Sequence, residues 1–131
     1  MTASQQGGDG SEPYSRALQH LEHGRVADAL ADLKTAARMP LYRFRASARL
    51  GQLHVARGEV AEGIDWLERA AEAPAPSPDE GWAVLYDLAN ALERIGETAR
   101  AMAVLIEIHT DAAGYRDVRA RIEQLSRAGK A

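Results

Sequence analysis

Neighbouring histidines and acids are the residues of this sequence best suited to chemistry. His20 and His23 lie three residues apart with Glu22 between them, and imidazole with carboxylate is a donor set that zinc accepts. A zinc site needs three or four converging ligands with supporting hydrogen bonds, and only two candidates, the two histidines, are local. His54 occupies the matching position of a later segment with the same pattern. We therefore interpret His20 as a packing residue and predict no metal site.

Other catalytic constellations do not stand out in the sequence. Without cysteine, thiol nucleophiles, disulfides and thiolate metal sites are excluded. The sequence shows no Ser/His/Asp set, no glycine-rich phosphate loop and no paired-carboxylate signature. We therefore predict a protein that is not an enzyme, with no catalytic residue and no cofactor.

Charge is distributed unevenly along the middle of the chain. Residues 41–58 contain four arginines and no acid, namely Arg43, Arg45, Arg49 and Arg57. Residues 59–80 contain Arg69 and seven acids, namely Glu59, Glu62, Asp65, Glu68, Glu72, Asp79 and Glu80. Such runs are usually solvated faces that pair within the molecule. The alternative is that the arginines face an acidic ligand.

The elements that position these residues follow from a repeated apolar pattern. Gly24 and Gly58 are 34 residues apart, and Gly58 and Gly96 are 38 residues apart. An alanine follows each glycine after three residues and a leucine after nine, giving Ala27, Ala61, Ala99, Leu33, Leu67 and Leu105. A period in this range is typical of stacked helical hairpins. The pattern predicts an all-helical fold.

The domain organisation follows from the same pattern. We expect a disordered tail at 1–11 and one domain at 12–131, with hairpins over about 13–40, 42–74 and 78–110 and a last helix over about 115–127. The proline-rich stretch 72–79 is a connector. Its Ser77 and Glu80 match a capping box with Pro78 at the first helical position.

The last helix carries a narrow apolar stripe, Val118, Ile122 and Leu125. A helix that is apolar on one side only is suited to close the open end of a helical stack. The spacing also predicts two ion pairs on its polar faces, Asp117–Arg121 and Glu123–Arg127.

These residues resemble the tetratricopeptide repeat (TPR) family over about residues 13–110, and 115–127 resembles its capping helix. The resemblance is carried by small residues where the two helices of a hairpin cross: Ala17, Gly51, Ala89, Ala29, Gly63, Ala101, Ala36 and Ala70. It implies a right-handed superhelix of three hairpins plus a capping helix. It also implies a surface that binds other proteins.

The resemblance further implies that the first helix of each hairpin lines a concave groove. The groove residues expected by matching positions are Arg45, Arg49, Gln52, Tyr86, Asn90 and Arg94. Asn90 resembles one element of the clamp with which some members hold a terminal carboxylate. We expect a protein or peptide ligand that is acidic or ends in a free carboxylate.

The leading functional prediction is an adaptor or scaffold that binds a partner in this groove. One alternative is a scaffold that self-associates, and another is a regulatory domain of a larger protein. Trp66 and Trp82 are expected in packing contacts, whereas an exposed Trp66 would favour docking on the convex face.

Composition narrows the class of partner. The net charge is −3 and the isoelectric point is near 5.8, so nothing indicates nucleic acid. No apolar run is long enough to cross a membrane, and the sequence start lacks the features of a signal peptide. We expect a cytoplasmic location without membrane insertion.

Overall fold

The computed structural model describes residues 8–130, and within this range the chain forms seven α-helices and no strand. The all-helical class predicted from the sequence is thus confirmed. The helices are α2 (Ser11–Glu22), α3 (Val26–Ala37), α4 (Arg43–Ala56), α5 (Val60–Glu72), α6 (Pro78–Arg94), α7 (Thr98–Asp111) and α8 (Val118–Lys130), with a short 3-10 helix η1 (Pro40–Tyr42) before α4. The predicted tail lies largely outside the described residues, and Ser11 already belongs to α2.

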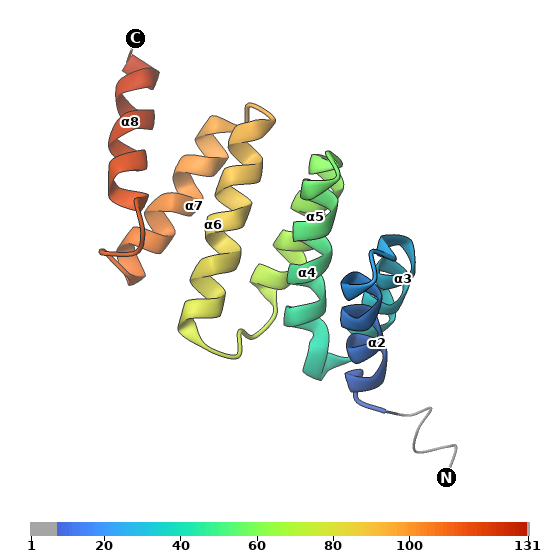
Figure 1. The fold of residues 1–131 in the computed structure, drawn as a ribbon. Coiled ribbons are helices and arrows are strands. Elements are labelled where there is room, and N and C mark those ends of the chain that lie inside the picture. The colour runs from blue at the N-terminus through green and yellow to red at the C-terminus, as the bar shows by residue number, and fades with distance from the viewer. Residues whose placement is uncertain (1–7, 131) are drawn as a thin grey trace.

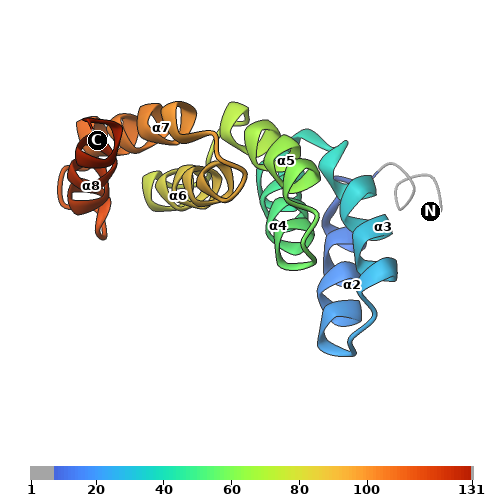
Figure 2. The same cartoon turned by 90° about the horizontal axis from the view of Figure 1, so that it is seen from above.

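Successive helices run in opposite directions and pack side by side in the order of the sequence (Figure 1). Seen from above, they form an arc (Figure 2). Helices α4 and α6 lie along the inner side of this arc, and α5 and α7 lie along its outer side. The two sides are called the inner and outer faces below.

The three hairpin turns share one geometry. Gly24, Gly58 and Gly96 have φ values of 72°, 84° and 82°, a left-handed conformation that glycine adopts without a steric penalty. The glycine N–H donates to a carbonyl three residues back, and the next N–H donates to a carbonyl five residues back. This pair of hydrogen bonds is the Schellman motif, which ends a helix. The repeated glycines therefore end α2, α4 and α6.

Helices α4 and α5 meet through a glycine seam formed by Gly51 and Gly63. A Cβ atom at Gly51 would lie 2.5 Å from Leu67 Cγ, and one at Gly63 would lie 2.9 Å from the Gly51 carbonyl oxygen and against Val55. Because buried Leu67 or the Val55 side chain, together with the facing backbone, occupies this space, neither position has room for a side chain. Glycine here allows the two helices to approach closely.

All eight small residues that were predicted at helix crossings are buried. Buried leucines and isoleucines surround them in three neighbouring clusters along the arc. Ile108 follows Gly96 by 12 residues, as the small residues Ala36 and Ala70 follow Gly24 and Gly58. It is fully buried against Val118 of α8. Its larger side chain therefore packs between α7 and the last helix.

The proline-rich connector leads into α6 through the predicted cap. The Glu80 backbone N–H donates to Ser77 Oγ over 3.2 Å, and the Ser77 hydroxyl donates to Glu80 Oε2 over 3.1 Å. Pro78 occupies the first turn. Ser77 as the N-cap of α6 is therefore confirmed.

The last helix begins later than the sequence indicates, at Val118 rather than near 115. Arg116 has φ 43°, which places a turn where the first helical turn was predicted. The two predicted ion pairs are wrong as well. Arg121 instead pairs with Glu93 of α6, and Glu123 pairs with Arg119 over 3.6 Å.

Both tryptophans are half-buried. Trp82 packs edge-on against Tyr115 with ring centroids 5.8 Å apart, and Trp66 packs against the cluster beneath α3 and α4. Across the described residues, every helix is too short or too polar to span a bilayer.

Candidate binding surface on the inner face

Two adjoining hollows lie between α4 and α6 on the inner face. The first has a volume of about 430 Å³ and is lined by Tyr14, Phe44, Arg45, Ala48, Arg49, Gln52, Glu80, Ala83 and Val84. The second has a volume of about 270 Å³ and is lined by Gln52, Val55, Ala56, Leu67, Asp87, Asn90, Ala91 and Arg94. Five of the six residues predicted for the groove line one hollow or the other. Tyr86 lies beyond them, toward α8.

Arg45 is paired across the first hollow. Its Nε donates to Glu80 Oε1 over 3.3 Å, and Glu80 also accepts the Ser77 hydroxyl. The hydrogen bond from Arg45 lowers the pKa of Glu80 and raises the pKa of the guanidinium. The segment around Arg45 contains no acid in the sequence. In the structure, Glu80 from the next hairpin lies beside Arg45 and partly neutralises its charge.

The other arginines of this segment also have partners, with one exception. Arg43 donates to the Ala37 and Arg38 carbonyl oxygens over 3.4 and 3.3 Å, at the end of α3. Arg57 pairs with Glu59 over 3.3 Å. Among the described residues, Arg49 has no ion pair. Three of the four arginines thus have partners within the molecule, as the first reading of this charge run expects, and half-buried Arg49 is the exception.

Gln52 marks the boundary between the hollows. Its Nε2 donates to Asp87 Oδ2 over 3.0 Å, which leaves its carbonyl oxygen available. At the far end of the second hollow, Arg94 donates to the Val55 carbonyl over 3.5 Å. Arg45, Gln52 and Arg94 thus all bridge α4 and α6.

Tyr86 and Asn90 are engaged by the C-terminal segment. The Tyr86 hydroxyl donates to Asp117 over 2.5 Å, and Arg121 donates to Asn90 Oδ1 and to Glu93. The Arg121 guanidinium also lies 5.2 Å from the centre of the Tyr86 ring. Below, these five residues are called the C-terminal clasp. The bond to Asp117 raises the pKa of Tyr86, and partial burial raises it further.

The histidines predicted to be packing residues each bridge two elements. His20 Nε2 lies 3.4 Å from Asp32 of α3, and buried His54 donates from Nδ1 to Glu59 over 2.8 Å. His23 instead contacts the Gln19 carbonyl over 2.9 Å. The His20/His23 pair therefore does not converge on a common point.

One group of metal-capable side chains was missed from the sequence. Donor atoms of His54, Glu59 and Glu62 lie within 4.8 Å of one another. The signal was a histidine at a helix end followed by acids at the start of the next helix. Here Glu59 already accepts a hydrogen bond from His54 and forms an ion pair with Arg57, and the bond from His54 lowers the pKa of Glu59. This arrangement is explained as a bridge between α4 and α5.

Chemically, the inner face offers an apolar floor with polar groups at its rim. Ala48, Ala83 and Val84 supply part of the floor, and the amides of Gln52 and Asn90 each retain groups outside the bonds described. Such a surface suits peptide binding, because a few placed polar groups orient a ligand held by apolar contact. No protein-family model matches this sequence, and comparison with curated proteins also finds no match.

Proposed function

We propose that this chain is a non-enzymatic protein-interaction module of the TPR type that binds a peptide segment of a partner protein on its inner face. The observation that carries the proposal is the pair of adjoining hollows between α4 and α6. Support for the family comes from the eight buried small residues and the three equivalent glycine turns.

The recognition chemistry follows from the groups at the rim. Arg49 offers its guanidinium to an acidic side chain or a terminal carboxylate. Arg45 can exchange Glu80 for the ligand, because an exposed ion pair contributes at most about 1 kcal/mol. The Gln52 carbonyl accepts a peptide N–H, and the Asn90 amide nitrogen donates to a peptide carbonyl. These groups fit an extended acidic peptide that crosses both hollows.

The proposal is tested by affinity capture followed by mass spectrometry and calorimetry. Two variants act on the hollows: Ala83→Phe fills the first, and Arg49→Glu reverses its unpaired charge. Arg127→Glu on α8 is the charge-matched control. A partner captured by the unaltered chain and by the control, but lost by both hollow variants, supports the inner face. A partner retained by both hollow variants would reject it.

Self-association is the competing function and is separable by light scattering. Exposed apolar residues provide candidate contacts for it, with Leu41 70% exposed and Ile106 47% exposed. A mass that stays near 14.2 kDa over a concentration series supports the adaptor. A mass that rises with concentration, and stops rising when Leu41 or Ile106 becomes serine, supports the scaffold.

A further inference from the structure

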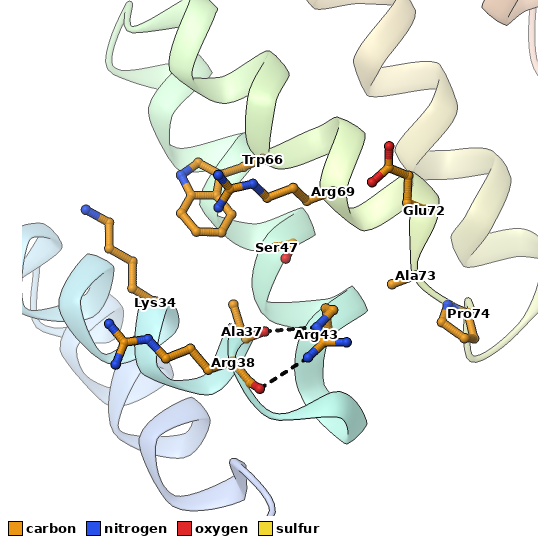
Figure 3. A pocket seen from close by; sticks show the side chains of 10 residues that line it. All are labelled: Lys34, Ala37, Arg38, Arg43, Ser47, Trp66, Arg69, Glu72, Ala73 and Pro74. Atoms are coloured by element: carbon orange, nitrogen blue, oxygen red, sulfur yellow. Dashed lines mark hydrogen bonds between the residues drawn. The ribbon is translucent and has the colours of Figure 1, made fainter.

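The outer face carries a larger hollow, of about 740 Å³, between α3, α4 and α5 (Figure 3). It is lined by Lys34, Ala37, Arg38, Arg43, Ser47, Trp66, Arg69, Glu72, Ala73 and Pro74. None of these residues lines the inner hollows. A ligand on the outer face therefore does not compete directly with one on the inner face.

The outer hollow is basic in a chain that is acidic overall. Four of its residues are cationic and only Glu72 is acidic, whereas the whole chain has a net charge of −3. Arg43 is occupied by the carbonyl groups that end α3. Within residues 8–130, Lys34, Arg38 and Arg69 have no ion pair. Three cationic groups are thus available to a ligand.

Trp66 forms a wall of this hollow and orients Arg69. The Arg69 guanidinium lies 4.5 Å from the centre of the indole ring, an arrangement that is favourable for a cation over an aromatic face. In Figure 3 the Glu72 carboxylate lies apart from that guanidinium. Stacking leaves the N–H groups at the guanidinium edge free to bind a carboxylate. Trp66, Ala37, Ala73 and Pro74 add apolar surface beside the charges.

We propose that the outer hollow docks an acidic peptide segment of a partner protein, with aliphatic residues between its carboxylates. The carboxylates reach Lys34 on α3, Arg38 just after its end and Arg69 on α5, and the aliphatic side chains pack against Trp66. The complementary charge steers the encounter and selects the partner.

The backbone around the hollow argues against a compact anion such as phosphate. Phosphate sites commonly use N–H groups at the start of a helix. Here the Ala37 and Arg38 carbonyls at the end of α3 are directed to Arg43, and a helix C-terminus carries partial negative charge. Carboxylates spread along a chain reach the separated cations without approaching those carbonyls.

Calorimetry and fluorescence test this proposal with a short end-blocked peptide of glutamate, leucine and glycine. A peptide with lysine in place of glutamate and inorganic phosphate are the two comparison ligands. Because the chain has two tryptophans, Trp82→Phe leaves Trp66 as the only indole reporter. We expect the acidic peptide to bind, to change Trp66 emission, and to bind more weakly as salt is raised.

Two variants remove the available cations, Arg69→Gln and the double variant Lys34→Gln/Arg38→Gln. The double variant should weaken binding about tenfold, since each surface pair contributes up to about 1 kcal/mol. Arg127→Gln should leave binding unchanged. Arg49→Gln, on the inner face, should leave the change in Trp66 emission unchanged, because Arg49 does not line the outer hollow. Circular dichroism of each variant is the check that it remains folded.

Several outcomes would overturn the proposal. The first is absence of binding by the unaltered chain, and the second is equal binding of the lysine peptide. A third is unchanged affinity in the cation variants, and a fourth is phosphate that binds as tightly as the peptide. If Arg49→Gln alone abolishes binding, the peptide occupies the inner face instead.

Discussion

The glycine seam and the C-terminal clasp join helices by opposite means. At the seam, Gly51 and Gly63 bring the backbones of α4 and α5 together, and no side chain separates them. At the clasp, α6 and α8 are joined by the long side chains of Tyr86 and Arg121, which reach across to the partner helix.

The difference shows where this molecule tolerates change. At a close-packed backbone contact an added atom meets both a packed side chain and the facing backbone, so the neighbouring structure must shift. A contact between long side chains has rotamer freedom and water-accessible alternatives. The seam therefore determines how α4 and α5 pack, whereas the clasp adjusts the position of the last helix over the groove residues.

Removal of the last helix should give the largest effect. A chain that ends at Gly114 loses the clasp and the apolar stripe that covers Leu105 and Ile108. We expect a loss of about 2–4 kcal/mol in the free energy of unfolding. The truncation exposes apolar surface of a few side chains, which lowers stability. The entropy cost of ordering α8 is removed at the same time, which offsets part of this loss. Urea denaturation measures this, with a chain ending at Gly129 as control. Equal midpoints would show that α8 does not stabilise the rest.

Gly63→Ala tests the seam directly. The added Cβ meets Val55 and the Gly51 carbonyl oxygen at 2.9 Å, so we expect a net loss of about 1–3 kcal/mol despite the better helix propensity of alanine. Gly129→Ala is the matched control, since nothing lies within 4 Å of its Cβ position. Thermal melts should show a lower melting temperature for Gly63→Ala than for Gly129→Ala. A Gly63 variant as stable as the control would contradict a closed seam.

Arg121→Met tests the clasp with a side chain of comparable length. It removes donors to Asn90 and Glu93, and we expect a loss of about 1–2 kcal/mol because charge-assisted bonds are replaced by water contacts. The loss should be smaller when Asn90→Ala and Glu93→Ala are already present, as a mutant cycle reports. Additive effects would mean that Arg121 acts elsewhere.

Acid should weaken the bridge that Glu59 forms with His54 between α4 and α5, beside the glycine seam. The hydrogen bond from His54, with a smaller contribution from Arg57, lowers the pKa of Glu59 below the ordinary glutamate value of 4.5. The stabilisation of the fold by ionised Glu59 is therefore present above about pH 4.5. It is lost as the pH falls through the lower pKa that Glu59 has in the folded state. Melting temperatures of the unaltered chain and of Glu59→Gln should differ at neutral pH and converge in acid. A constant difference would show that ionised Glu59 does not matter.

Alkali should act on the clasp instead, with the smallest effect. Asp117 and partial burial raise the pKa of Tyr86 above the ordinary tyrosine value of 10.0. The stabilisation of the fold by the protonated Tyr86 hydroxyl is therefore fully present below about pH 10. It is lost as the pH rises through the folded-state pKa. Ultraviolet titration, with Tyr86→Phe as the difference reference, should show a late-ionising tyrosine that ionises earlier in Asp117→Asn. An unchanged titration in Asp117→Asn would contradict the bond.

The sequence predicted the helices and their ends well because those depend on local chemistry. Three glycines, the Ser77 cap and the small crossing residues each have a local or periodic signature. The predicted start of α8 was wrong because Arg116 adopts a left-handed conformation that its residue type disfavours. Tertiary packing of Tyr115 beside Trp82 accompanies that turn.

The sequence predicted most of the residues that line the inner hollows, but it did not predict which of them bind to one another. Arg45–Glu80 and Gln52–Asp87 are both separated by 35 residues, close to the spacing of the glycines. Partners one period apart lie on neighbouring inner helices, so the period itself contained the signal. The outer hollow was harder to find, since Lys34, Arg38 and Arg69 come together only when α3 and α5 pack against α4.

The order of helix packing also bears on how the chain folds. Most of the close contacts join helices that are adjacent in sequence, with α4 and α6 the main exception. Because such contacts close only short loops, little chain entropy is lost before each gains its stabilisation, and topologies of this kind fold rapidly. Folding can therefore proceed one helix at a time in either half of the chain. The two halves then join when α5 and α6 pack across the connector between them.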